Sequence, residues 1–312
     1  MKLKEKRHKY LQKRALDKAI HKLIGDYGKY YIYDWGMLVF NFDVEKLKSL
    51  ENLEFNLPSK EQIINEAKSI YKNFDSSDIK KVQYNFSFFG RIGYGFKDQN
   101  LILNANGSNI KLSCSSFNSI KITEANKVFV YSEIISDINI KSKSVVLYSI
   151  NNNLNCVNLE CDKIILKAFA RLYAKKIIFK ALNIDLGDDS KLCAKTVILR
   201  AKTINSSYRS YEDPNEISGQ KIMLDADFID IKGTILDAEK EIIIKNKSCN
   251  YIQTICSPKI VYNGKDISHN DEIVIQKLRH RLISTLKEIK DNVSDNIESY
   301  AANEQFTKIL KK

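Results

Sequence analysis

The sequence predicts a mainly β protein: a parallel β-solenoid (parallel β-helix) with an N-terminal α/β cap and a C-terminal helix. A six-residue pattern (polar, aliphatic, apolar, aliphatic, polar, small) occurs seven times between residues 127 and 246. The seven copies begin 17, 19, 13, 20, 25 and 20 residues apart, and self-similarity with a period of roughly 20 residues is the signature of a solenoid. The aliphatic positions are mostly Val and Ile, which favour strands over helices.

Residues 1–98 predict the cap. Residues 3–24 have an apolar side and are followed by a glycine, which predicts a helix. The first 22 residues hold nine Lys or Arg and two acidic residues, so this helix is strongly basic. Residues 30–42 and 82–88 are rich in aromatic and β-branched residues and predict strands. Residues 59–73 predict a second helix, with a serine as its N-cap.

Residues 99–268 form the predicted β-helix, and residues 269–312 a helix with a polar tail. In each copy of the pattern the two aliphatic positions point inward, because side chains alternate along a strand, and we expect the small sixth residue to turn inward at a corner. In the last segment, apolar residues follow at steps of 3, 4, 4, 3, 4, 4 and 3, an eleven-residue repeat suited to packing on another surface. This predicted oligomer seam consists of Ile275, Leu278, Leu282, Leu286, Ile289, Val293, Ile297 and Tyr300.

The middle position of the pattern points outward, yet it is apolar in all seven copies. If the copies stack one above another at about 4.8 Å, these residues form an apolar stripe roughly 30 Å long. The predicted stripe is Phe129, Val146, Ile165, Ile178, Ile198, Met223 and Ile243. Its predicted basic borders are Lys163, Lys167, Lys176, Lys180, Arg200, Lys221 and Lys245. Soluble monomers rarely leave such a stripe bare, so we expect the terminal helix, a second subunit or a partner protein to cover it.

An excursion of the chain lengthens the interval after the fifth copy. Residues 205–220 are polar, and insertions in solenoids are loops that often lie on the binding side. The candidate contacts are Tyr208, Arg209, Tyr211 and Glu212. The alternative interpretation is an ordinary polar surface loop.

Composition points to acidic partners and offers no cofactor. The chain of 312 residues carries 50 Lys and Arg against 38 Asp and Glu, a net charge of +12 that favours nucleic acid or an acidic glycan as possible ligands. The six cysteines and four histidines lack the spacing of metal ligands, so no metal site is predicted. The sequence shows neither a signal peptide nor a transmembrane segment, which suggests a cytoplasmic protein or one within a virion or another assembly.

The repeats resemble those of parallel β-helix proteins. Over residues 99–268, the period and the small corner residues are similar to filamentous-haemagglutinin-type arrays at the level of architecture. Within this architecture, polysaccharide lyases and hydrolases use acidic clusters on one outer face. The resemblance therefore implies an alternative role as such an enzyme, for which the candidate catalytic residues are Asp185, Asp188, Asp189, Asp225 and Asp227.

The sequence favours a non-enzymatic structural or assembly protein, as in a phage particle or another large bacterial complex. In that case the apolar stripe or the seam binds a protein partner or a second copy. A polysaccharide-acting enzyme is the first alternative. A nucleic-acid-binding scaffold that uses the basic N-terminal helix is the second, because cations supply affinity for phosphates.

Overall fold

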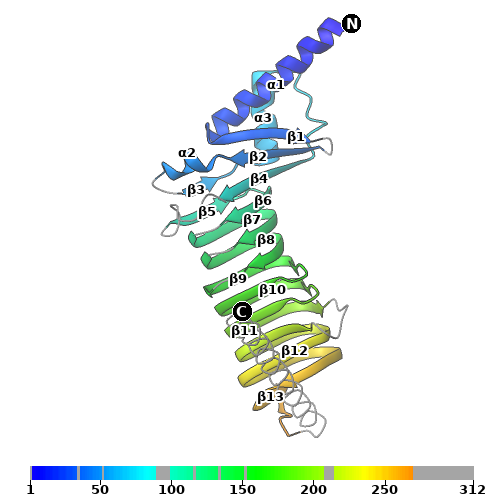
Figure 1. Ribbon diagram of the computed structural model, residues 1–312. Coiled ribbons are helices and arrows are strands. Elements are labelled where there is room, and N and C mark those ends of the chain that lie inside the picture. The colour runs from blue at the N-terminus through cyan, green and yellow to red at the C-terminus, as the bar shows by residue number, and fades with distance from the viewer. Residues whose placement is uncertain are drawn as a thin grey trace, which may run out of the picture.

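The computed structural model confirms the predicted fold class: a parallel β-solenoid of about seven turns joined to an N-terminal α/β region (Figure 1). It describes residues 2–33, 36–50, 53–88, 99–114, 117–132, 135–150, 153–206 and 214–269. The predicted C-terminal helix and its seam lie outside these residues. The same holds for the predicted boundary of the cap near residue 98.

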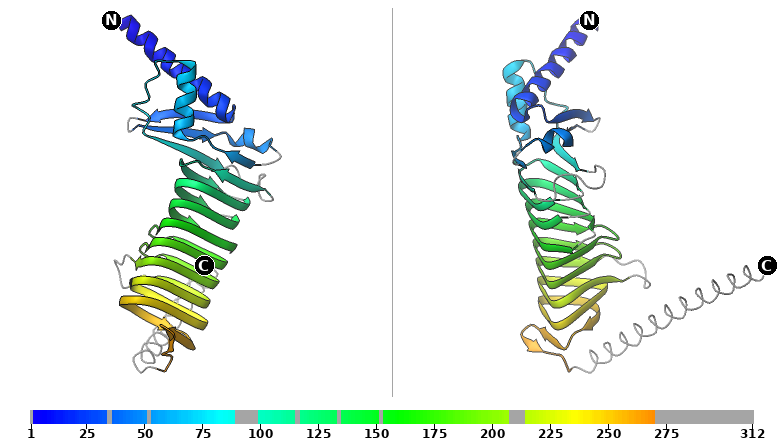
Figure 2. Two further views of the ribbon diagram at one scale, coloured as in Figure 1. Left: turned by 180° about the vertical axis from the view of Figure 1, so that it is seen from behind. Right: turned by 60° about the vertical axis from the view of Figure 1, so that its left-hand side comes forward.

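Helix α1 (Lys2–Ile24) crosses the top of the molecule and projects beyond it (Figures 1 and 2). Its second half is buried through Ala15, Leu16, Ala19 and Ile20, which lie on one side of the helix and pack towards α3 (Lys60–Ile70). Residues 4–10 are all exposed. The helix is therefore anchored at its C-terminal half and leaves its most basic part in solvent.

Two shorter helices complete the cap. Helix α3 begins where the sequence predicts, because Ser59 caps it: the side chains of Ser59 and Gln62 reciprocally bond each other's backbone N–H groups. Its face with Ile63, Ile64 and Ala67 is buried. Helix α2 (Val44–Lys48) is capped by the side chain of Asp43 and was not predicted from the sequence.

Strands β2 to β13 pair in parallel in the order β2-β4-β6-β7-β8-β9-β10-β11-β12-β13, and β1 and β14 close the two ends in antiparallel pairing. Strand β3 pairs with β5, and β5 pairs with β7. The strands are β1 (Gly28–Tyr33), β2 (Met37–Phe42), β3 (Leu53–Asn56), β4 (Lys81–Phe88), β5 (Asn100–Asn104), β6 (Asn109–Cys114), β7 (Phe117–Ser132), β8 (Ile135–Ile150), β9 (Asn153–Leu166), β10 (Arg171–Leu186), β11 (Lys191–Ser206), β12 (Asn215–Cys256), β13 (Lys259–Tyr262) and β14 (Lys265–Asp266).

A full turn of the solenoid has three sides, which β10 illustrates. We call them face A (171–174), face B (176–180) and face C (183–186). Each face stacks on the same face of the next turn, because residues 171, 176 and 183 of β10 pair with residues 191, 196 and 203 of β11. Long strands therefore bend around corners rather than run straight.

The interior is filled by the apolar positions of all three faces. In β10 these are Leu172, Ile177, Phe179, Ile184 and Leu186, each at most 2 % exposed. The core is continuous from α1 in the cap to β13, so the cap and the solenoid share one hydrophobic interior. Stacked rungs of this kind bury nearly all their aliphatic surface only when neighbouring turns are present.

The small sixth residue of the pattern does not always turn inward, contrary to our expectation. Ala226 is buried, Ala181 and Ala201 are half-buried, and Ala168 is exposed. The corner after Ala168 explains this difference, because Phe169 takes a left-handed conformation (φ 63°) and the chain swings outward before it enters face A. No helix in the described part of the chain is long and apolar enough to span a membrane.

Candidate interaction surfaces

The seven outward apolar residues do not form one stripe, and this part of the prediction is wrong. Phe129 pairs with Val146 and Val146 with Ile165, all on face C. The next residue in register with Ile165 is Asp185, whereas Ile178 aligns with Asn158 on face B. The interval of 13 residues between the third and fourth copies is about two thirds of a turn, so it carries the pattern from face C, past face A, to face B of the following turn.

Face C carries the first group, which we call the aromatic patch: Phe129, Tyr131, Val146, Tyr148 and Ile165. The rings of Tyr131 and Tyr148 stack with centroids 3.9 Å apart. Burial and the hydrogen bond with Tyr148 raise the pKa of Tyr131 to about 12. Val146 is only 2 % exposed although it points away from the interior, because its neighbours on both rungs are large.

Two lysines extend over the rings of this patch. The Lys127 ammonium lies 4.7 Å from the centroid of the Phe129 ring, and that of Lys111 lies 5.5 Å from the Tyr131 ring. Such cation–π contacts cover the aromatic faces with aliphatic stems while the charges remain in water. The rings of the aromatic patch are thus largely covered by other side chains of the same chain.

Face B carries the second group, which we call the apolar column: Ile178, Ile198, Met223, Ile243 and Val261. Ile178 pairs with Ile198, Ile198 with Met223, and Ile243 with Val261. The ion pair between Lys221 and Glu241 (2.8 Å) shows that the rungs of Met223 and Ile243 are neighbours. All five side chains are half-buried. At about 4.8 Å per rung the column is about 19 Å long.

Its borders are basic but interrupted by acids. On one side Lys176 is followed by Thr196, Lys221, Glu241 and Lys259. Glu241 accepts hydrogen bonds from Lys221 and Lys259, at 2.8 and 2.7 Å, and both lower the pKa of its carboxyl group.

The other border runs from Lys180 through Arg200 to Asp225, and Arg200 lies 3.7 Å from the Asp225 carboxylate. Lys245, which follows the column residue Ile243 on the same strand, is exposed. Two lysines of the predicted border do not belong here: Lys163 is on face C and binds Asp185 at 2.7 Å, and Lys167 follows at the corner that ends face C.

The aspartates of the alternative enzymatic interpretation do not converge. Asp185 lies on face C, in register with Asn205 and two rungs from Asp230. Asp225 lies at the edge of face B, and Asp189 is buried at the corner before face A, 3.7 Å from Arg171. The register therefore separates the cluster near residue 185 from the cluster near residue 225.

Asp225 and Asp227 line a hollow of about 540 Å³ beside Lys245 and Lys247. Asp227 binds Lys247 at 2.9 Å, so the carboxylates of this hollow already have cation partners. Glycoside hydrolysis requires two carboxyl groups placed on either side of a sugar bond, one of them able to hold a proton. In this hollow each of the two carboxylates is instead engaged by a cation, Asp225 by Arg200 and Asp227 by Lys247. Asp188, the fifth candidate, lies beside Asp189 at the same corner.

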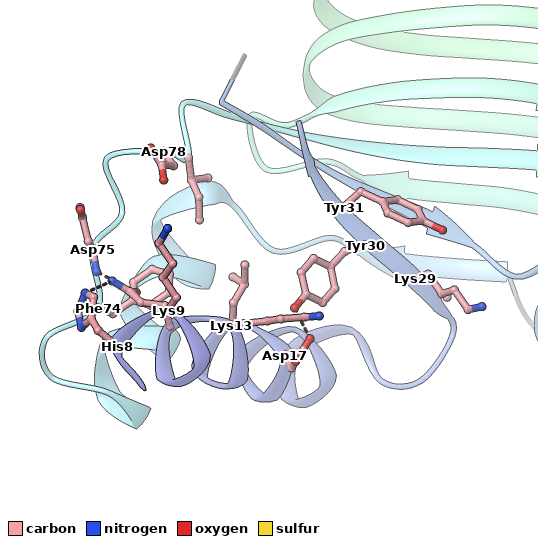
Figure 3. Close-up of a pocket in the computed structure, with 14 residues that line it drawn as sticks. His8, Lys9, Lys13, Asp17, Lys29, Tyr30, Tyr31, Phe74, Asp75 and Asp78 are labelled. Atoms are coloured by element: carbon pink, nitrogen blue, oxygen red, sulfur yellow. Dashed lines mark hydrogen bonds between the residues drawn. The ribbon is translucent and has the colours of Figure 1, made fainter. Parts of the chain in front are cut away.

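A third surface was not predicted: a groove of about 860 Å³ in the cap, between α1, β1 and residues 74–79 (Figure 3). Leu16, Phe74 and Ile79, all buried, form its apolar floor. Tyr30 points from β1 towards α1 and donates a hydrogen bond to Asp17, and burial together with this bond raises the pKa of the phenol. The basic residues of α1 and the tyrosines of β1 are visible in the sequence, but their approach is a tertiary feature.

The remaining predicted sites lie outside the described residues. These are the loop residues Tyr208, Arg209, Tyr211 and Glu212, and the seam from Ile275 to Val293. Comparison of the chain with protein-family models, with curated proteins and with solved structures gives no match. The fold and these surfaces are therefore the observations from which a function has to be argued.

Proposed function

We propose that this protein is a structural component that assembles by self-association, in which face B of one copy receives the C-terminal segment of another. The observation that carries the proposal is the apolar column with its basic borders on face B. Residues 270–312 follow directly after the last described turn of the solenoid. Their sequence contains an apolar seam that needs a partner surface.

Charge supports this pairing. Lys176, Lys180 and Lys245 have no ion pair with any residue that the structure describes. Two copies of face B brought face to face would repel each other, because both are basic. In contrast, residues 288–298 of the C-terminal segment hold four acidic side chains and one basic side chain around the apolar residues Ile289, Val293 and Ile297. This half of the seam complements the column in both polarity and charge.

Length favours a second copy over the chain's own segment. The helix that the sequence predicts over residues 275–300 would be about 39 Å long at 1.5 Å per residue. The apolar column is about 19 Å long. About half of the seam would stay uncovered if it lay on a single column, and a second copy of the seam or of another surface has to bury the rest.

Area leads to the same conclusion. A column about 19 Å long on a face about 17 Å wide covers roughly 300 Å². A stable interface buries about 800 Å² per partner. The column therefore serves as the centre of a larger contact that also uses its basic borders and the seam.

The test is the molar mass in solution, measured by light scattering for three proteins: the full chain, a chain that ends at Ile267, and the double variant Ile178→Asp with Ile198→Asp. We expect an oligomer for the full chain and monomers for the other two. The control is the double variant Asn139→Asp with Asn158→Asp, which adds the same charge to face B above the column and should stay oligomeric. A monomeric full chain would overturn the proposal.

Binding of nucleic acid is a second candidate function, because residues 4–10 of α1 are all exposed and project from the cap. Affinity for duplex DNA, measured by fluorescence anisotropy, should then fall steeply with salt concentration. The triple variant Lys4→Glu, Lys6→Glu and Arg7→Glu should abolish it, whereas the exposed Lys72→Glu should not. An unchanged affinity of the triple variant for duplex DNA would exclude α1 as the site.

A further inference from the structure

The edge of the sheet at β1 is open. In the described part of the chain β1 pairs with β2 alone. The carbonyl of Tyr27 accepts a hydrogen bond from the N–H of Asp43 (2.6 Å). In an antiparallel pair every second residue directs its backbone N–H and C=O groups towards the partner strand, so this bond shows which residues of β1 do so. The backbone groups of Gly28, Tyr30 and Ile32 therefore face away from β2. An edge strand with unpaired N–H and C=O groups is a template for another strand.

The cap groove runs along this edge. Its lining includes 28–31 from β1, together with α1 and residues 74–79 (Figure 3). Helix α1 packs mainly on α3, and among the described residues Tyr30 bridges the space beside the edge by binding Asp17. A strand added to β1 would have one of its sides against the apolar floor of the groove.

The two sides of such a strand would meet different chemistry. On the side of α1 lie the apolar floor and the aliphatic stems of Lys9 and Lys13. On the other side Lys29 and Tyr31 extend away from α1, and Tyr31 is 47 % exposed (Figure 3). None of these three lysines forms an ion pair with a residue that the structure describes.

The acidic residues of the groove are placed differently. Asp17 is engaged by Tyr30, and Asp75 accepts a hydrogen bond from the N–H of Ser77 at 2.9 Å. Asp75 and Asp78 belong to the segment that closes the groove beyond the C-terminal end of β1 (Figure 3). The groove therefore carries three lysines without an ion pair among the described residues, and its carboxylates Asp75 and Asp78 lie at the end away from Lys29 (Figure 3).

We propose that the free edge of β1 and the cap groove form a strand-addition site for an extended segment of a partner protein, with apolar side chains on one side and carboxylates on the other. The backbone of the segment pairs with Gly28, Tyr30 and Ile32. Its apolar side chains lie towards α1, and its carboxylates lie beside Lys29. Main-chain hydrogen bonds supply affinity in this mode of recognition, and the alternating side chains supply specificity.

This site is independent of face B and of the proposed self-association, because it lies in the cap at the opposite end of the body from β13 (Figure 1). The molar mass measurements above do not bear on it. Its own test uses a fluorescein-labelled octapeptide of alternating valine and glutamate, with binding followed by fluorescence anisotropy.

Two N-methylated versions of this peptide test the backbone pairing on the unaltered protein. In an extended strand all valine N–H groups point to one edge and all glutamate N–H groups to the other. Methylation of the amides that face β1 should abolish binding, and methylation of the other set should leave it within about twofold. Equal affinities of the two versions would overturn the proposal in favour of simple charge attraction. Equal binding of a valine–lysine peptide would also overturn it, because carboxylates would then have no role beside Lys29.

Two pairs of variants locate the site. Tyr30→Pro removes an N–H that β2 does not use and should weaken binding about tenfold or more, whereas Tyr30→Phe keeps that N–H and should bind nearly as well as the unaltered protein. Lys29→Glu should also weaken binding, and Lys18→Glu, an exposed position of α1 outside the groove, should not. Unchanged affinity of both Tyr30→Pro and Lys29→Glu would exclude β1 as the site.

Discussion

Two adjacent isoleucines of β10 offer a direct test of the inside–outside alternation on which every surface described above depends. Ile177 is fully buried between Val157 and Val197 of the neighbouring turns, and Ile178 belongs to the half-buried apolar column. Substitution of either by Ala removes the same three carbon atoms from the same strand. The two variants therefore differ only in the side of the sheet from which the atoms are lost.

The expected costs differ severalfold. Loss of three buried carbons costs about 2.4 kcal/mol at about 0.8 kcal/mol each. At Ile177 a cavity forms as well, which brings the cost to about 4 kcal/mol, within the range of about 2–5 kcal/mol for such changes. At Ile178 about half of the transfer term is lost and no cavity forms, so the cost is about 1 kcal/mol.

Guanidinium denaturation followed by far-UV circular dichroism measures both values on the chain that ends at Ile267, in which no partner segment covers the column, provided that the slope of the transition is the same in the variants and the parent. We expect the midpoint for Ile177→Ala to fall several times further than that for Ile178→Ala. Equal shifts, or a larger shift for Ile178→Ala, would refute the assignment of Ile178 to the outer surface and with it the apolar column.

Three further predictions concern single positions. Gly219→Ala should destabilise the protein by roughly 2 kcal/mol or more in the same denaturation assay, because a Cβ there would lie 1.7 Å from the carbonyl oxygen of Ala194. The pKa of the Glu241 carboxyl group lies below the ordinary 4.5, so its ionised form stabilises the fold above pH 4.5. This contribution disappears as the pH falls through the lowered pKa. Glu241→Gln should therefore flatten the decline in melting temperature between about pH 5 and pH 3. In alkaline absorbance titrations Tyr131 should ionise near pH 12, and Tyr148→Phe should bring its pKa closer to 10.

The solenoid was predictable because its rule is local. An inward apolar residue at every second position, as in Ile177 and Phe179, defines a strand wherever it lies on the turn. The same rule does not say which face a strand belongs to. Val157 and Leu159 lack the full six-residue pattern, yet they are the direct neighbours of Ile177 and Phe179 on face B.

The interval of 13 residues was the available signal for the change of face. It is too short for a complete turn, and the second strands between the copies show that each turn has several sides. The cap groove had no comparable signal, because it arises from the way α1 and α3 pack together beside β1. Helix α2 and strand β3 are 5 and 4 residues long, too short for their periodicity to be recognised.

The shift of the apolar residues from face C to face B shows that the inside and the outside of this solenoid are specified separately. Folding constrains only the residues that point into the core, and these remain apolar on all three faces through the described turns. The outward residues are then free to vary from one rung to the next. A molecule built in this way can acquire, lose or relocate a contact surface through changes at single outward positions, while the rod that carries the surface keeps its shape.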